Sequence, residues 1–187
     1  MNLTLSTAEK LAGDIQDGYD SKIADKVDTV VCPTYLQIPG VAKVLESEVS
    51  LGAQNLYWEK EGAYTGEVSA DILKESGCKY VIIGHSERRE YLNETNEMVS
   101  KKAQAALAAG LTPIICIGEN KEQRDGGETN EFLEKQLLAA IKSIEQEDMA
   151  RVIVAYEPIW AIGSGDPASA EDAEEIASLV RKILTDK

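Results

Sequence analysis

The residues best suited to chemistry in this chain follow two short apolar runs. His85, the only histidine, lies in VIIGHSERRE, and Glu157 lies in IVAYEPIWAIGSG ahead of a small-residue loop that contains Gly163. The positive end of a helical turn keeps an imidazole neutral and able to donate to an oxygen, while a carboxylate leaving an apolar strand is partly desolvated and suits a general base. With an amide-rich lid, these groups indicate proton abstraction next to a carbonyl. A capping histidine, a surface carboxylate and a plain glycine loop would leave the same pattern of residues. Spacing alone therefore does not decide between a catalytic and a structural role.

Five apolar runs and six helical patterns must position these residues. The runs, rich in Val and Ile, lie at 27–33, 49–54, 80–86, 112–119 and 152–158. Near-continuous runs of this kind are typical of parallel strands that are buried on both faces. Amphipathic or capped helical patterns lie at 6–19, 38–47, 69–77, 93–110, 128–144 and 169–187. The order predicts either an open doubly wound sheet or a (β/α)₈ barrel, and both place reactive residues at the carboxyl ends of strands.

The composition argues against several classes of partner. The chain of 187 residues, which we expect to form a single domain over 1–187, carries 33 acidic and 19 basic residues and a net charge of −14. That charge disfavours nucleic acid and anionic membranes. Cys32, Cys78 and Cys116 have no metal-binding spacing, and no dinucleotide or P-loop motif is present, so we expect no metal and no cofactor. We also expect a cytoplasmic protein, because the chain shows no signal peptide or membrane span.

Long segments of the chain resemble the triosephosphate isomerase family. YVIIGHSERRE and VIVAYEPIWAIGSG are similar to its two signature segments, and GAQNLYWEKEGAYTGEVSA (52–70) is similar to its third loop. TPIICIGE resembles the family's fifth strand, and MNLTLSTAEKLA resembles its first helix. The similarity runs in order through essentially the whole chain. It therefore implies an α/β fold: a parallel-stranded, partial (β/α)₈ barrel with five strands and six helices.

The resemblance implies a cofactor-free interconversion of dihydroxyacetone phosphate and glyceraldehyde 3-phosphate, a step of glycolysis and gluconeogenesis. His85 would polarise the substrate carbonyl, and Glu157 would carry the proton between two carbons. Gly163 would offer its amide to the substrate phosphate as part of the lid. Glu87 would support the site as a second carboxylate, and Ser86 would hold Glu157 while the lid is open.

Two further residues have alternative interpretations. In the family, the residue at the position of Thr65 enters a neighbouring subunit, which implies self-association; read alone, its loop is an ordinary solvated loop. Cys116 would pack behind the family's active site, but its type and place also fit a small buried apolar residue, and we favour this second interpretation.

The resemblance also draws attention to differences from the family. The asparagine and lysine of its first strand, and the serine–glycine pair of its phosphate loop in the last two strand–helix units, are not among these residues. Asp166-Pro167-Ala168 stands where the family has a basic residue and an aliphatic one. We therefore expect open sheet edges at 27–32 and 152–157, self-association, and strongly reduced activity. The alternative is an inactive barrel fragment that acts as a folding or assembly scaffold or as an interaction protein.

Overall fold

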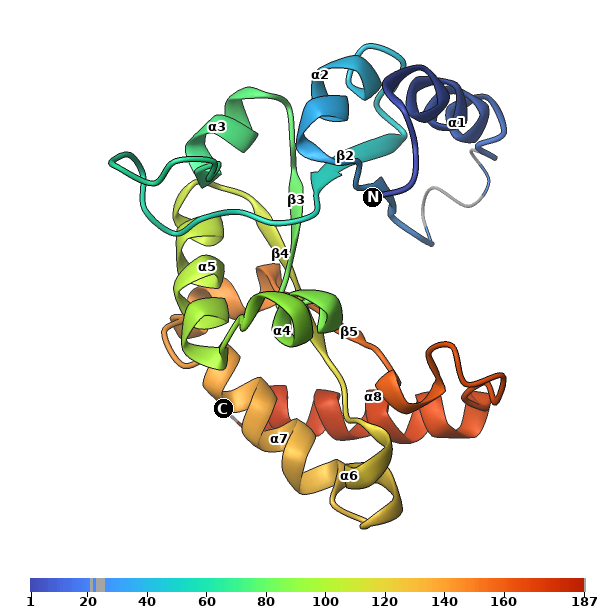
Figure 1. The fold of residues 1–187 in the computed structure, drawn as a ribbon, viewed down its shortest axis with the longest axis vertical. Helices are drawn as coiled ribbons and strands as arrows, with labels where there is room; N and C mark the ends of the chain where they lie inside the picture. The colour runs from blue at the N-terminus through green and yellow to red at the C-terminus, as the bar shows by residue number, and fades with distance from the viewer. Residues whose placement is uncertain (21, 23–25, 187) are drawn as a thin grey trace. The chain divides into compact units, whose positions relative to one another are not determined.

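The structure is a computed structural model that describes residues 1–20, 22 and 26–186. Its strands are β1 (Thr29–Val31), β2 (Val49–Ala53), β3 (Tyr80–Ile83), β4 (Thr112–Ile117) and β5 (Ile153–Tyr156) (Figure 1). Its helices are α1 (Leu5–Asp17), α2 (Ile38–Val41), α3 (Ala70–Glu75), α4 (Ser86–Leu92), α5 (Asn96–Ala108), α6 (Lys121–Asp125), α7 (Thr129–Ala140) and α8 (Ala170–Asp186). Short 3₁₀ segments are η2 (Tyr35–Gln37), η3 (Gln146–Arg151) and η4 (Ile159–Ala161). Lys187, the end of the predicted helix 169–187, lies outside the described residues.

The strands form one sheet in sequence order, β1-β2-β3-β4-β5. The pairs β1–β2, β2–β3 and β4–β5 are parallel, with Thr29 opposite Val49 in the first and Ile114 opposite Ile153 in the last. Adjacent residues at the ends of β2 and β4, such as Cys116 and Ile117, are both buried, whereas β3 alternates between buried and partly exposed residues and β1 has no fully buried residue. The predicted parallel α/β fold, in the strand order of consecutive units of a (β/α)₈ barrel, is confirmed.

The helices differ from the sequence prediction in three places. Helix α4 lies outside the six predicted patterns, where the sequence indicated only a helical turn after His85. The pattern at 38–47 forms only one turn of α-helix, α2, because the backbone then changes to tighter bonds: the N–H of Val44 donates to the carbonyl of Val41 at 3.1 Å. The short helix α6 was not predicted. Its signal in the sequence is a capping box, in which Asn120 and Gln123 satisfy each other's backbone N–H groups.

Contacts divide the chain into two compact units, which we describe separately. The first contains 1–82 and 105–113, and the second contains 83–104 and the residues from 114 on. In the second unit, α7 and α8 lie side by side and bury Leu133, Leu137, Ile176 and Val180. All the predicted catalytic residues belong to the second unit, whereas Thr65 belongs to the first.

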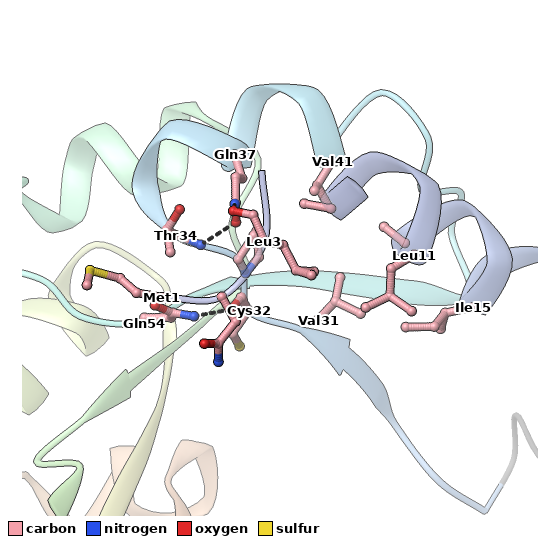
Figure 2. Close-up of a pocket in the computed structure, with 14 residues that line it drawn as sticks. Met1, Leu3, Leu11, Ile15, Val31, Cys32, Thr34, Gln37, Val41 and Gln54 are labelled. Atoms are coloured by element: carbon pink, nitrogen blue, oxygen red, sulfur yellow. Dashed lines mark hydrogen bonds between the residues drawn. The ribbon is translucent and has the colours of Figure 1, made fainter. Parts of the chain in front are cut away.

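The first unit contains a cavity of about 290 Å³ beside α1 and the end of β1 (Figure 2). Gln37 donates to the carbonyl of Leu3 at 2.5 Å, and Gln54 donates to the carbonyl of Cys32 at 3.0 Å. The apolar wall of the cavity includes Leu11, Ile15, Val31 and Val41. None of the predicted catalytic residues lines this cavity, so the chemistry must be sought in the second unit.

Candidate active site

Glu157 leaves the end of β5, and its carboxylate is held by two neighbouring groups. Its Oε2 accepts a hydrogen bond from the backbone N–H of Ser86 at 3.0 Å, and its Oε1 lies 3.3 Å from His85 Nε2. The side chain is 16% exposed. It is therefore partly desolvated but still within reach of solvent, as its place after an apolar strand predicts.

His85 is the residue before α4, and its ring caps that helix. The Nδ1 atom accepts a hydrogen bond from the backbone N–H of Glu87 at 3.3 Å. An accepting ring nitrogen carries no proton, so this network assigns the proton of a neutral ring to Nε2. Nε2 is the atom that faces Glu157. The imidazole thus presents one N–H to whatever oxygen stands in front of it.

Ser86 and Glu87 lie beside the pair in different ways. Ser86 contacts Glu157 through its backbone, and its side chain is buried. Glu87 has a side chain that is 78% exposed, with Oε2 3.9 Å from His85 Nδ1. Nδ1 accepts the Glu87 N–H, so it does not donate a hydrogen bond to the Glu87 carboxylate. The predicted supporting role of Glu87 stays a prediction.

Gly84 orients the chain just before His85. Its φ is +70°, and a Cβ at this position would lie 2.9 Å from Val99 and 2.8 Å from Arg89. Its N–H donates to Glu94 Oε1 at 2.8 Å, and its carbonyl accepts from Arg89 Nε at 2.6 Å. Only glycine combines this left-handed backbone with this close packing. The direction in which β3 delivers His85 is therefore set by Gly84 and two charged neighbours.

A buried ion cluster anchors this turn. The carboxylate of Glu94 is 2% exposed and is ion-paired with Lys102, itself 4% exposed, and with Arg88 Nε at 2.7 Å. Burial alone raises the pKa of Glu94, but the hydrogen bonds and charge of Lys102, with the hydrogen bonds of Arg88 and Gly84, outweigh it and lower that pKa. The Glu94 carboxylate is therefore ionised at neutral pH, and its contacts with Lys102, Arg88 and Gly84 hold the start of α4 in place.

Cys116 lies behind the candidate site, in β4. Burial raises the pKa of its thiol, and the neighbouring Glu157 raises it further. The thiol is therefore protonated at neutral pH, which does not suit a nucleophile. Its carbonyl accepts from Arg89 at 3.1 Å, so the residue also helps to join the ends of β3 and β4. These facts agree with the interpretation of Cys116 as a small buried residue.

The exits of β4 and β5 approach each other closely. The N–H of Glu157 donates to the carbonyl of Ile117 at 2.8 Å. A Cβ at Gly118 would lie only 2.0 Å from the carbonyl oxygen of Glu157. The glycine is thus required for the backbone contact that positions Glu157. Gly118 also lines, with Ser86 and Arg89, a cavity of about 640 Å³ in the second unit.

The predicted lid begins at η4 and contains two glycines in the left-handed region. Gly163 has φ +70° and Gly165 has φ +79°, and both are exposed. Between them, Ser164 donates from its hydroxyl to the carbonyl of Ala161 at 2.9 Å. The loop is therefore exposed and rich in glycine, as predicted. Its contact with a phosphate stays a prediction.

Sequence reasoning missed a buried carboxylate at the start of this lid. Glu119 is fully buried, and its Oε1 accepts from the Tyr156 hydroxyl at 3.0 Å and from Trp160 Nε1 at 2.9 Å. Burial raises the pKa of Tyr156 to about 12. The available signal was the position of Glu119 after an apolar run, which matches that of Glu157. The lid is thus joined to the ends of β4 and β5.

Among the described residues, no three His, Cys, Asp or Glu side chains cluster as a metal would need, and no helix in them combines the length and hydropathy that crossing a membrane requires. Thr65 is exposed in a loop of the first unit, where the ring of Tyr57 stacks on Trp58 at 4.1 Å between centroids. The predicted role of Thr65 in an interface stays a prediction.

Known proteins resemble this chain over most of its length. A family model described as Triosephosphate isomerase matches residues 1–187. A triosephosphate isomerase of Dictyoglomus thermophilum is 47% identical over 174 residues, which cover 92% of this chain and 68% of the relative. Those of Thermoanaerobacter sp. strain X514 and Alkaliphilus oremlandii are 46% and 44% identical over 98% and 100% of this chain. The matches cover 73% and 75% of these two relatives.

Proposed function

Because the chain belongs to the triosephosphate isomerase family, we propose that it interconverts dihydroxyacetone phosphate and glyceraldehyde 3-phosphate. The observation that carries this proposal is the position of the Glu157 carboxylate, 3.3 Å from His85 Nε2 and 3.0 Å from the Ser86 N–H. These groups come from the ends of β3 and β5. A base and a hydrogen-bond donor that face each other suit a reaction in which one takes a proton from carbon while the other polarises the adjacent oxygen.

The reaction needs a proton to leave one carbon and return to its neighbour. Glu157 accepts the proton from C1 of dihydroxyacetone phosphate, and the electron pair of that C–H bond moves toward the carbonyl at C2. The Nε2–H of His85 donates to the C2 oxygen and stabilises the enediolate that results. Glu157 then returns the proton to C2, and the hydroxyl proton passes from the C1 oxygen to the C2 oxygen. No electron acceptor or donor is needed, so the reaction requires no cofactor.

Ser86 and the lid have supporting roles in this proposal. The Ser86 N–H holds Glu157 at 3.0 Å when no substrate is bound, and Glu157 leaves it to reach the substrate carbon. Gly163 offers its backbone amide to the substrate phosphate when the lid closes, and the residue is exposed, with no heavy atom within 4 Å of a Cβ built there. Glu87 supports His85 as a nearby carboxylate.

We further infer a cytoplasmic, self-associating enzyme of glycolysis and gluconeogenesis. The free thiols of Cys32, Cys78 and Cys116 support a reducing compartment. The exposed loop of Thr65, with its stacked aromatic rings, supports contact with a second copy of the chain. The net charge of −14 favours neither nucleic acid nor an anionic membrane as a partner.

A steady-state isomerase assay tests the proposal. The chain is purified from a host that lacks its own triosephosphate isomerase, together with Glu157→Gln and the matched control Glu75→Gln, an exposed carboxylate of α3 in the other unit. We expect Glu157→Gln to abolish turnover, because an amide cannot accept the carbon proton, and Glu75→Gln to retain it. Turnover that persists undiminished in Glu157→Gln would show that Glu157 is not the base and would overturn the proposed mechanism. No turnover in either chain would favour a scaffold or interaction role instead.

We expect slow turnover from a polypeptide of these 187 residues assayed alone. The substrate-contacting lysine that the resemblance led us to expect is not among them. One preorganised electrostatic group contributes about 10²–10³ in rate, so the turnover should lie about a thousandfold below that of the full-length relatives. The same assay, with a relative purified in parallel, measures the ratio. Equal turnover would contradict this expectation and would point to another cation in the lysine's place.

A further inference from the structure

One guanidinium contacts residues at both ends of the lid. Arg124 of α6 lies over the ring of Trp160, with its Cζ 4.7 Å from the ring centroid, and it forms an ion pair with Asp172 in the first turn of α8. Trp160 stands at the start of the lid and Asp172 just after its end. We propose that Arg124 is a positioning residue that clamps both ends of the lid, residues 161–168, and so directs its closure over the phosphorylated substrate. The involvement of a substrate in this inference rests on the proposed function, whereas the clamp itself does not.

At the first end, Arg124 is part of a buried polar arrangement. Trp160 Nε1–H donates to Glu119 Oε1 at 2.9 Å, and Arg124 Nη1 lies 3.7 Å from the same oxygen. The carboxylate of Glu119 is 0% exposed, and a buried carboxylate needs a nearby cation. The guanidinium supplies that charge and also covers one face of the indole, where the ring's negative quadrupole attracts it. The orientation of Trp160 is thus fixed through its edge and its face.

At the other end, Asp172 transfers the contact to the backbone. Its Oδ2 accepts from the N–H of Ser169 at 2.9 Å and from the Ser169 hydroxyl at 2.7 Å, while its Oδ1 accepts from Arg124. These hydrogen bonds of Ser169, and then Arg124, lower the pKa of Asp172 to about 2. Asp172 is therefore ionised throughout the neutral range, and Ser169, the first residue after the lid, is held by a full charge.

The clamp restricts the lid at its two ends. When Trp160 and Ser169 are fixed, the segment between them is a short closed loop, and its conformational freedom is smaller than that of a loop with free ends. Gly163 and Gly165, which lie between these ends, are exposed, with no heavy atom within 4 Å of a Cβ at either position. Loss of the clamp should therefore loosen the lid from its ends.

The clamp differs from an ordinary surface ion pair in its environment. The side chains of Arg124 and Asp172 are 28% and 22% exposed. On the same helix, Lys121 pairs with Asp125 at 2.5 Å, with side chains that are 68% and 61% exposed. Exposed ion pairs such as Lys121–Asp125 contribute little to the stability of the fold. Lys121→Met is therefore a matched control: it removes one positive charge from α6 without affecting Trp160 or Asp172.

The test reads the lid directly, in a Trp58→Phe background where Trp160 is the remaining tryptophan. The chains compared carry Arg124→Met, Arg124→Lys, Asp172→Asn or Lys121→Met. Trp160 emission reports the first end of the lid, limited proteolysis within 161–168 reports its freedom, and isomerase kinetics report its use. Far-UV circular dichroism verifies that each chain is folded.

We expect Arg124→Met to shift Trp160 emission, to speed cleavage of the lid and to lower kcat/KM about tenfold, mainly through KM, because a misplaced binding group weakens the productive complex. Arg124→Lys retains the charge but not the planar stack, so it should restore the cleavage rate more than the emission. Asp172→Asn should speed cleavage and leave the emission unchanged. Lys121→Met should alter none of the three.

Several outcomes would overturn the clamp. Unchanged Trp160 emission and lid cleavage in a folded Arg124→Met chain would do so, even if activity fell. If Arg124→Met does not fold, Asp172→Asn decides, and an unchanged cleavage rate in that variant rejects the clamp. If the Trp58→Phe parent shows no isomerase activity but emission and cleavage respond as expected, the clamp stands and the proposed function fails.

Discussion

At the scale of single residues, one backbone N–H decides what His85 can do. A histidine at the start of a helical turn is expected to be neutral, but neutrality leaves two positions for the proton. The N–H of Glu87 donates to Nδ1 at 3.3 Å, and the proton is thereby assigned to Nε2, which faces Glu157. The reactive orientation thus depends on where α4 begins, and α4 in turn depends on the buried ion cluster of Glu94.

We expect Glu94→Gln to destabilise the folded chain, because it breaks this buried ion cluster. Glu94→Gln removes the charge that balances Lys102 and Arg88, which pair with Glu94 in a site where its side chain is 2% exposed. Breaking a buried ion pair in this way costs about 3–5 kcal/mol of unfolding free energy. The matched control is Glu97→Gln, whose ion pair with Lys101 is largely exposed. Urea denaturation of the three chains measures the difference. Equal destabilisation by both substitutions would contradict a special role for the buried cluster.

The pH dependence of the same comparison follows from the direction of the Glu94 shift. The pKa of Glu94 is lowered in the folded chain, mainly by Lys102 acting against burial. A lowered folded pKa gives stability that is fully present above the unfolded pKa of about 4.3 and is lost as the pH falls through the folded value. We therefore expect the gap in unfolding free energy between wild type and Glu94→Gln to be constant from pH 7 to about 5 and to shrink below it. A gap that grows in acid would reverse the assigned sign.

At the scale of elements, the exits of β4 and β5 are joined through a single glycine. The two strands pair in parallel from Ile114 opposite Ile153 to Ile117 opposite Tyr156. The backbone hydrogen bond from Glu157 to Ile117, at 2.8 Å, extends their pairing beyond the strands themselves. Gly118 allows this extension because it has no side chain. The base therefore owes its position to a neighbouring strand.

Gly118→Ala tests this junction. The added Cβ would lie 2.0 Å from the Glu157 carbonyl oxygen, a contact that forces the end of β5 to move. We expect a loss of about 1–3 kcal/mol in unfolding free energy, as for other overpacked sites, and a loss of most isomerase activity. The control is Gly13→Ala in α1, where a Cβ meets nothing within 4 Å and where alanine favours the helix. If Gly118→Ala were as stable and active as Gly13→Ala, the junction would not position Glu157.

At the scale of the whole molecule, the two edge strands of the sheet bear on assembly. β1 and β5 occupy those ends, and Ile153 of β5 is 40% exposed. Exposed apolar edge strands tend to pair with a strand of another chain unless they are covered. The exposed loop of Thr65 offers a second surface, since Tyr64 is 41% exposed beside it. Each unit of the molecule therefore offers a surface for the self-association proposed above.

We expect a dimer or higher oligomer in solution. Light scattering coupled to size exclusion measures the mass of the chain and of three variants: Thr65→Arg, Ile153→Lys and the control Ile72→Lys, which alters an apolar residue of α3 that is 51% exposed. A charge placed in a contact surface weakens association, so at least one of the first two variants should shift toward monomer while the control does not. A monomeric parent chain at high concentration would reject the prediction.

The sequence by itself determined the class of fold and the candidate residues. Continuous Val and Ile runs separated by amphipathic patterns predict parallel strands in sequence order, because each strand must be buried on both faces and each crossover needs a helix. His85, Glu157 and Gly163 stand out because they follow such runs, at the ends where parallel strands place reactive groups. Only the tertiary structure decided which atoms meet. Contacts between distant segments, or the geometry of single hydrogen bonds, set the tautomer of His85 and the use of the Ser86 backbone in place of its hydroxyl. They also set the roles of Glu94, Gly118 and Arg124. Such contacts leave no periodic trace in a sequence, since hydrophobic periodicity records burial, whereas hydrogen bonds and ion pairs depend on distances that the packing alone sets.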